Sequence, residues 1–454
     1  MSRPAFVRQV TRICDTEAPP RAEAPPRAEA PQRAEVPQRG GSSQRDDSRV
    51  ISPRVRAALA YAALFAAVGS MLPYIPLYYR SLGFSLGEVG AILALGALVG
   101  LLASPSWGAL SDRMRGSPRV LVAAAATAFA GQAMLALFTT QILVYLGAAL
   151  LGAGIAGLSP IVDARALETA GANRAGFGPL RAWGSAAYIV AVLGTGMAVD
   201  RFGLHSFFAI LSVMLVLTAI AGLALRPAAH ERPFQTAARP LRDAGRLFGP
   251  RGLGVFLLGA FLTWLGMSAV LTYTPIRFIE LGAGATIVGL GGAIAAGIEV
   301  PLMLRFPQLA QRWGADRLLI AGSVLTAARG VVAAVATDPP VLLAASIFGG
   351  LGFALFFIGG VTYVSQHVPP ELAATAQGIF QGVGNSLAQV TAQALGGAVA
   401  TVTSVAGLFA IAAGIGIVGA AIIGLAVRRT VAGPARTRLA PAPAAHADRR
   451  LDTR

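Results

Sequence analysis

Two ionisable side chains interrupt long apolar segments of the chain. Glu299 lies inside the apolar run from Gly289 to Phe306, and Arg329 lies in the middle of a separate apolar segment. If these segments cross a bilayer, an ionised side chain there is costly unless it is protonated, paired or in contact with water. A carboxylate that exchanges between such states can take up and release a proton, and we expect Glu299 and Arg329 to act in proton coupling.

The relation between these two residues stays open at this point. Arg329 can pair with Glu299 on a neighbouring helix, or it can bind the carboxylate of a ligand. Counting along the helices places Glu299 about 8 Å nearer one side of the membrane, so a direct ion pair is not assured. The structural alternative is that each charge is paired only to hold the helices together.

A second charged cluster contains Asp163 at the end of one apolar segment and Arg181 at the start of the next. Asp163 is the deepest acidic member, and we expect it to face a cavity and to contribute to proton coupling. Arg181 is expected to line the same cavity. A structural charge network at the membrane surface is the alternative interpretation.

Uncharged polar residues give further candidates for a ligand cavity. Between residues 372 and 400 a polar side chain recurs at every fourth position: Gln377, Gln381, Asn385, Gln389 and Gln393. Residues four apart share one slanted helix face, and lipid would not tolerate this face, so it must meet another helix or water. We expect Gln381 and Asn385 to line the cavity, with hydrogen bonding between helices as the alternative.

Three more side chains are expected in the cavity. Gln132 lies in the middle of an apolar segment, and Trp264 and Tyr74 are aromatic side chains that could stack on a ring-bearing ligand. For the aromatic residues, a position in the interfacial belt of a membrane protein is the alternative.

The elements that must position these residues are membrane helices. The 454-residue chain is 55% hydrophobic and only 13% charged, whereas a soluble protein is about a quarter charged. About twelve apolar segments are long enough to cross a bilayer. Their expected ranges are 57–79, 88–110, 119–138, 141–162, 178–199, 205–225, 251–279, 285–306, 318–337, 341–365, 372–400 and 403–427.

The remaining segments are polar and divide the chain into five parts. A disordered tail rich in Pro, Arg, Glu and Ala (1–50) and a disordered basic tail (429–454) are expected to flank two six-helix halves (51–225 and 251–428). A cytoplasmic linker (226–250) joins the halves. Arginine residues concentrate in the tails, in this linker and in alternate short loops, so the positive-inside rule places both termini in the cytoplasm.

The two halves carry an internal repeat. A constant offset of the numbering moves Tyr74 and Pro76 onto Tyr273 and Pro275, and it also moves Val89-Gly90 onto Val288-Gly289. Because equivalent helices then run in the same direction, the halves are parallel repeats. Transporters with this plan bind their substrate near the midplane between the repeats.

The loop after the second segment carries a resemblance to a known family. Its sequence, from Gly108 through Asp112 and Arg113 to Gly116, looks like the signature loop of the major facilitator superfamily. The resemblance spans about 55–428 and is greatest to the phenylpropionate-permease-like branch, related to nucleoside and oligosaccharide proton symporters. It implies an all-α membrane fold of two parallel six-helix repeats, and it implies a gating role for Asp112, Arg113 and Gly108. Gln311 replaces the acidic residue in the second half, so any latch there is weaker.

These observations favour a secondary active transporter of a small organic solute, working by alternating access. Proton-coupled uptake is the expected mode, and proton-coupled efflux of a small hydrophobic compound or a transport-inactive sensor are the alternatives. No motif of an enzyme, of a nucleotide site or of a metal site is present, so we expect no catalytic activity, no metal and no cofactor besides the proton gradient. The expected partners are the lipid bilayer, the solute and protons, without nucleic acid. A monomer in the cell inner membrane is expected.

Overall fold

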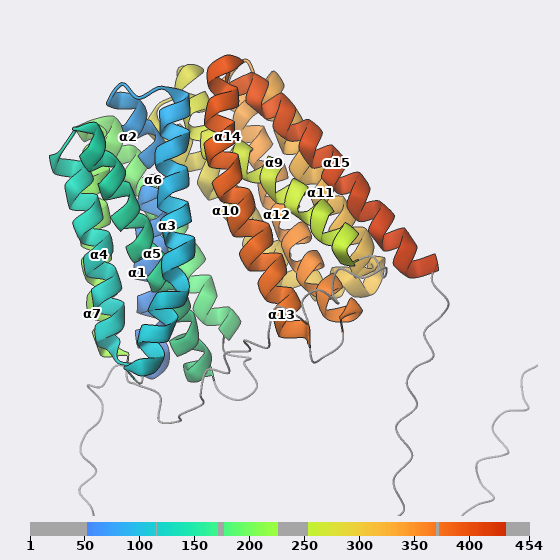
Figure 1. Ribbon diagram of the computed structural model, residues 1–454, viewed down its shortest axis with the longest axis horizontal. Helices are drawn as coiled ribbons and strands as arrows, with labels where there is room; N and C mark the ends of the chain where they lie inside the picture. Colours follow the sequence, from blue (N-terminus) through green and yellow to red (C-terminus); the bar gives the residue numbers. More distant parts are fainter. Residues whose placement is uncertain (1–51, 115, 171–176, 226–252, 369–371, 433–454) are drawn as a thin grey trace, which may run out of the picture. The chain divides into compact units, whose positions relative to one another are not determined.

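The protein is an all-helical bundle over the part of the chain that its computed structural model describes (Figure 1). The described residues are 52–114, 116–170, 177–225, 253–368 and 372–432. The expected N-terminal tail (1–50) and linker (226–250) lie outside them, as does all but the first few residues of the expected C-terminal tail.

Over its described residues, the first half of the sequence forms seven helical segments, coloured blue to green in Figure 1. They are α1 (Pro53–Met71), α2 (Ile75–Ser81), α3 (Leu86–Arg113), α4 (Pro118–Leu137), α5 (Gln141–Ala170), α6 (Phe177–Phe202) and α7 (Ser206–Ala224). The local sequence explains where several of these helices begin. At α3, for example, Ser85 and Glu88 form a capping box, in which the Glu88 carboxylate accepts a hydrogen bond from the Ser85 backbone N–H at 2.8 Å.

The second half repeats this arrangement, but its helices are interrupted at other positions than those of the first half. Its helices are α9 (Leu253–Glu280), α10 (Ala285–Trp313), α11 (Ala315–Val335), α12 (Pro339–His367), α13 (Ala373–Gly378), the π-helix η4 (Ile379–Leu387), α14 (Ala388–Val402) and α15 (Val405–Ala432). The expected helix over 372–400 is therefore one span with a π-helical middle. The expected first helix is broken near Pro73 into α1 and α2, whereas α9 continues through Pro275.

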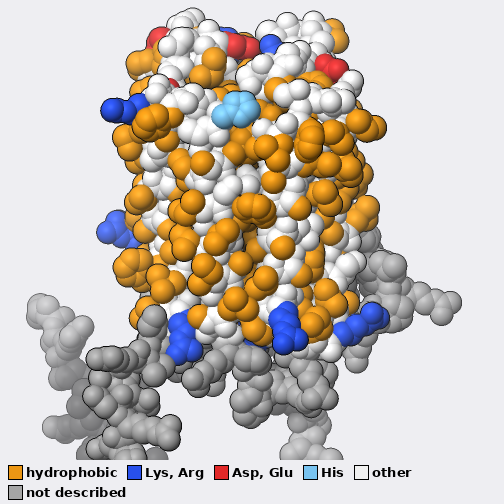
Figure 2. All heavy atoms as spheres, turned by 90° about the vertical axis from the view of Figure 1, so that its left-hand side faces the viewer, with side chains coloured by type: hydrophobic (Ala, Val, Ile, Leu, Met, Phe, Trp, Pro, Cys, Tyr) orange, Lys and Arg blue, Asp and Glu red, His pale blue; other side chains and the backbone are white. Residues whose placement is uncertain are grey.

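The described helices have the dimensions of membrane spans. Eleven of them are long and apolar enough to cross a bilayer, and the α13–η4–α14 segment supplies a further one, which agrees with the expected number of about twelve. Figure 2 shows hydrophobic side chains over the whole flank of the α1–α7 half, with several arginine side chains along the lower rim and acidic side chains along the upper rim. This distribution is the one that a bilayer requires.

The two halves touch mainly through two helix crossings, α3 on α14 and α6 on α10, and α2 also contacts α9. At each crossing, a glycine lies in close contact with the backbone of the opposite helix. A Cβ atom at Gly90 would lie 2.3 Å from the Gln393 carbonyl oxygen, and one at Gly289 would lie 2.5 Å from the Val192 carbonyl oxygen. Gly90 and Gly289 are equivalent positions of the repeat, so the two crossings are related by the symmetry of the halves. Small residues permit such close backbone approach between membrane helices.

Candidate functional site

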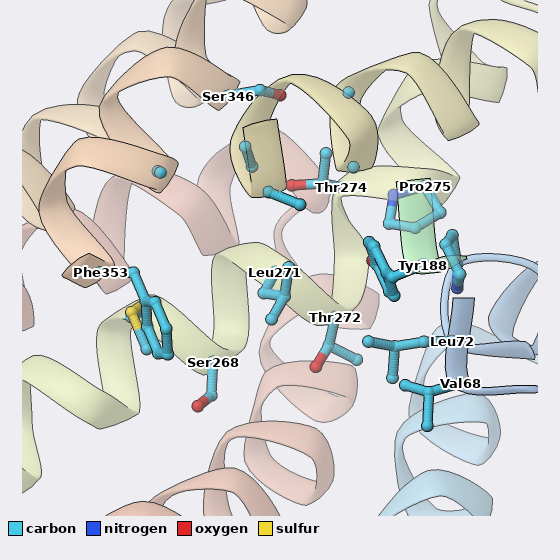
Figure 3. A pocket seen from close by; sticks show the side chains of 18 of the residues that line it. Val68, Leu72, Tyr188, Ser268, Leu271, Thr272, Thr274, Pro275, Ser346 and Phe353 are labelled. Carbon is cyan, nitrogen blue, oxygen red and sulfur yellow. The ribbon is translucent and has the colours of Figure 1, made fainter. Parts of the chain in front are cut away.

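A cavity of about 420 Å³ lies between the two halves. Its wall includes α1, α2, α3 and α6 from the first half and α9, α10, α11, α12, η4 and α14 from the second. Figure 3 shows Val68 and Leu72 from the first half lying beside Leu271 and Thr272 of α9. The size is that of a site for a small organic molecule.

Glu299 and Arg329 both line this cavity. The side chain of Glu299 is half-buried in α10, and Arg329 on α11 is only 8% exposed. Tyr188 on α6 lies within electrostatic range of both residues. The structure therefore brings the two expected charges to one site, and it adds a hydroxyl group from the opposite half.

The polar row of the interrupted helix reaches the cavity over part of its length. Asn385, Gln389 and Gln393 line the wall. Gln381, expected beside Asn385, is exposed and is absent from the wall, and the Gln377 side-chain N–H donates to the Val361 carbonyl at 2.7 Å. The π-helix η4 explains the change of face, because its wider i→i+5 turn rotates residues four apart away from a common line.

Trp264 is the largest aromatic side chain among the residues of the wall. Its ring packs edge-on against Phe356, with a centroid distance of 5.1 Å, and is 2% exposed. Its indole Nε1 has no hydrogen-bond partner among the described residues. A buried donor of this kind is normally satisfied, and Nε1 is itself buried in this structure.

Several expected cavity residues lie elsewhere. The Tyr74 hydroxyl donates to the Val192 carbonyl at 2.5 Å inside the first half, beside the α6–α10 crossing. The Gln132 side-chain N–H donates to Ser212 Oγ at 2.6 Å between α4 and α7. Neither residue belongs to the cavity wall. Each makes one hydrogen bond between packed helices.

Asp163, in the second half of α5, is also absent from the cavity wall. The Asp163 carboxylate accepts a hydrogen bond from the Tyr61 hydroxyl of α1. Arg181 lies in α6, but its side chain is outside the described part of the structure. Asp163 thus joins two helices of one half and does not face the expected ligand site.

The expected gating residues lie at the end of α3. Asp112 and Arg113 are exposed and Gly108 is half-buried. Within the described residues, Asp112 and Arg113 make no hydrogen bond through their side chains and no ion pair. In the next loop, Gly116 has a φ of 64°, and the Arg165 guanidinium packs against it.

The opposite end of the bundle is fastened across the halves by Asp200. This residue lies in the last turn of α6, and its carboxylate accepts hydrogen bonds from the backbone N–H groups of Ala285 at 2.7 Å and Thr286 at 2.8 Å. These groups are unpaired donors of the first turn of α10, where the helix dipole also favours a negative charge. The two halves are therefore held together at this end.

A family model described as the MFS_1 like family matches residues 55–411. The chain belongs to this family. It is a transporter of the major facilitator superfamily and not an enzyme, as the resemblance of its signature loop implies. The finer assignment to one branch of the superfamily stays a prediction.

Two other transporters are similar to the chain along most of their length. The chain is 28% identical over 333 residues to the maltose permease of Geobacillus stearothermophilus, which covers 72% of this chain and 83% of that protein. It is 27% identical over 305 residues to the multidrug resistance protein MdtG of Dickeya zeae, covering 62% and 72% of the two chains.

Solved structures agree with the fold. A crystal structure of a mutant of the nucleoside transporter NupG superposes with a TM-score of 0.72 at 19% identity, covering 83% of this chain and all of that one. An auto-inhibited peptide transporter of the POT family gives a TM-score of 0.64 at 15% identity, covering 86% and 99%.

Sequence reasoning missed three residues of this MFS_1-like transporter. Tyr188 could have been found, because an amphipathic tyrosine in the middle of a span needs a polar partner. Gly349, a wall residue against which the Arg329 side chain packs, and Asp200 gave no usable signal. Glycine is frequent in this chain, with 54 residues, and Asp200 lies at a helix end where a solvated carboxylate is ordinary. Among the described residues, no group of three His, Cys, Asp or Glu side chains is placed to hold a metal ion.

Proposed function

We propose that this transporter takes up a small organic solute together with protons, by alternating access of the cavity to the two sides of the membrane. The observation that carries the proposal is the cavity between the halves, with Glu299 and Arg329 in its wall. An ionisable pair at this depth is costly to keep unless it serves transport. A site between parallel repeats is accessible to each side in turn when the halves rock.

Glu299 is the proton-binding group in this scheme. A carboxylate that faces a cavity open to one side of the membrane at a time can take up a proton from one compartment and release it to the other. Arg329 and Tyr188 face the same space and set the electrostatic environment of the carboxylate. Asp163 is left out, because it is hydrogen-bonded to Tyr61 within one half.

The gating residues fit the same scheme. The halves are fastened at the end that carries Asp200, and at the other end Asp112 is exposed, with no side-chain partner among the described residues. This is the arrangement expected of a carrier open at the Asp112 end, with the latch formed by Asp112 and Arg113 released. The arginine-lined rim supports a cytoplasmic position for that end and for both termini of this inner-membrane protein.

Reconstitution of the purified full chain into liposomes tests the proposal. Uptake of radiolabelled maltose, uridine and phenylacetate is measured with the outside acidic, with the inside acidic and without a pH gradient. Proton-coupled uptake predicts that at least one solute accumulates above equilibrium, and above its level in protein-free liposomes, when the outside is acidic, and that a protonophore abolishes this accumulation. Accumulation of none of these solutes under either gradient would contradict it.

Efflux is the second candidate, and the similarity to MdtG favours it. An exchanger of solute for protons accumulates its solute in the same liposomes only when the inside is acidic. The sign of the effective gradient therefore separates uptake from efflux in one experiment.

A further inference from the structure

The two crossings between the halves, α3 on α14 and α6 on α10, contain equivalent hydrogen bonds. Beside α10, the Tyr74 hydroxyl donates to the Val192 carbonyl at 2.5 Å. Beside α3, the Tyr273 hydroxyl donates to the Gln393 carbonyl at 2.8 Å. The internal repeat aligns these two tyrosines. Each bond lies within one half, so the halves can separate without breaking either bond.

Helix α10 begins without a cap from its own sequence. Its N-cap residue is Gly284, which has no side chain that could accept a hydrogen bond. The Asp200 carboxylate of the opposite half accepts from the N–H groups of Ala285 and Thr286 instead. A carboxylate at this position satisfies unpaired donors and is favoured by the helix dipole. Separation of α6 from α10 therefore breaks two hydrogen bonds to a charged group.

Helix α3 begins with a cap from its own sequence. The Ser85 hydroxyl accepts from the Glu88 N–H, and the Glu88 carboxylate accepts from the Ser85 N–H at 2.8 Å. The repeat aligns Ser85 with Gly284 and Glu88 with Ile287, and these residues of α10 cannot form such a capping box. The start of α3 is therefore complete within its own half, whereas the start of α10 depends on a residue of the opposite half.

Thr401 occupies the place of Asp200 at the α3–α14 crossing. It follows Gln393 at the same spacing in the sequence as Asp200 follows Val192. Its Oγ1 lies near the start of α3, 3.4 Å from the place of a Cβ atom at Gly87. The Thr401 hydroxyl nevertheless donates to a carbonyl of its own helix at 2.9 Å. Over the described residues, no hydrogen bond joins α3 to α14, so separation of these two helices breaks none.

Two features of α14 itself favour its separation from α3. The Gln393 side chain lines the cavity, and its Oε1 is buried without a hydrogen-bond partner among the described residues. An unsatisfied buried acceptor is unfavourable, and separation of the crossing admits water to it. Helix α14 also continues directly from the π-helix η4, and π-helical turns are places at which a helix bends.

We infer that the two crossings form a gate that opens in two steps, in which α14 leaves α3 before α10 leaves α6. The Asp200 cap is the reason for this order, because only the second step breaks it. After the first step the cavity is reached along the α3–α14 crossing, where Leu93 and Gln393 belong to its wall. This inference rests on the alternating access of the proposed function and is independent of proton coupling and of the direction of transport.

Pulsed electron resonance on the full chain, with Cys14 replaced by serine, tests the order. One pair of spin labels, at Ser81 and Val402, spans the α3–α14 side, and a second pair, at Phe202 and Glu280, spans the α6–α10 side. All these positions are exposed, and the repeat aligns Ser81 with Glu280. The population with a long distance should be larger by about fivefold or more across α3–α14, as expected from the free energy of a cap. Equal populations, including none on either side, or a larger one across α6–α10 would overturn the order.

Two changes of the cap test its role. Asp200→Ala should raise the long-distance population across α6–α10 to within about twofold of that across α3–α14, and a difference as large as in the parent would overturn the role of the cap. The cap can also be transferred: Ser85→Gly and Glu88→Ile give α3 the uncapped start of α10, and Thr401→Asp adds a carboxylate from the opposite half. This triple variant should lower the α3–α14 population to within about twofold of the α6–α10 population. The matched control, Ser85→Gly with Glu88→Ile alone, should not lower it.

The accumulation of solute in liposomes is measured independently of these distances. If no solute accumulates while the crossings separate in this order, proton-coupled uptake fails and the two-step gate stands. If a solute accumulates while the two long-distance populations are equal, uptake stands and the two-step gate fails.

Discussion

The carboxylate of Asp200 accepts a hydrogen bond from the backbone N–H of Ala285 at 2.7 Å, although the two residues belong to opposite halves of the transporter. A second N–H of the same helix turn, from Thr286, reaches the other carboxylate oxygen at 2.8 Å. A side chain of one half therefore caps a helix of the other. When the carrier opens at this end, this cap has to break.

Removal of the cap should favour opening at this end. Loss of a capping carboxylate costs about 1–2 kcal/mol, which corresponds to a change of about five- to thirtyfold in the balance of the two states. We expect Asp200→Ala to increase the population with a long distance between spin labels at Phe202 and Glu280, measured by pulsed electron resonance in a background with Cys14 replaced by serine.

Asp338 provides the control for this experiment. It caps α12 inside a single half, where its carboxylate accepts from the Val341 N–H at 3.0 Å. Asp338→Ala should lower the thermal stability and leave the label distances unchanged. Equal distance distributions in Asp200→Ala and the parent protein would contradict the role of Asp200.

The close packing at the glycine crossings predicts that a bulky side chain placed there prevents the two halves from closing. A Cβ at Gly289 would lie 2.5 Å from the Val192 carbonyl oxygen and 2.7 Å from the Tyr74 hydroxyl. An indole cannot fit there, so Gly289→Trp should hold the halves apart at this end and reduce exchange of phenylacetate across proteoliposomes at least tenfold. Gly297→Trp, on the same helix, should exchange at close to the parent rate. Full exchange by Gly289→Trp would show that this end need not close.

Packing within the first half gives a prediction about stability. A Cβ at Gly152 would lie 2.1 Å from the Gly96 carbonyl oxygen, where α5 crosses α3. Overpacking of this kind costs about 1–3 kcal/mol, so Gly152→Ala should lower the thermal unfolding temperature in detergent. Gly194→Ala should not, because its added Cβ has no atom within 4 Å. An unchanged unfolding temperature for Gly152→Ala would mean that the two helices separate without cost.

The sequence predicted the spans and the repeat closely, because a long apolar run has few alternatives in a bilayer. It also predicted that Glu299 and Arg329 belong to a site, since a charge inside a span is rarely neutral to function. Gln132 and Tyr74 were expected in the cavity and lie between packed helices. The sequence indicates that a polar group in the middle of a span needs a partner. It does not indicate how the helix is rotated, and therefore whether that partner lies in the cavity or on a neighbouring helix.

Two other features depend on contacts that sequence patterns do not contain. The π-helix at Ile379–Leu387 turns Gln381 away from Asn385, although their spacing is regular in the sequence. The path of Arg329 past Gly349 depends on how α11 and α12 lie against each other. Both features are set by tertiary packing rather than by local propensity.

Proton coupling through Glu299 is the central claim, and Glu299→Gln tests it most directly. Two measurements on one preparation of proteoliposomes are compared: accumulation of solute driven by a pH gradient, and exchange of external for internal solute without a gradient. The amide keeps the shape of the side chain but cannot give up a proton. We predict that Glu299→Gln exchanges solute within about twofold of the parent rate and accumulates none. Accumulation driven by the pH gradient at the parent level would contradict the claim.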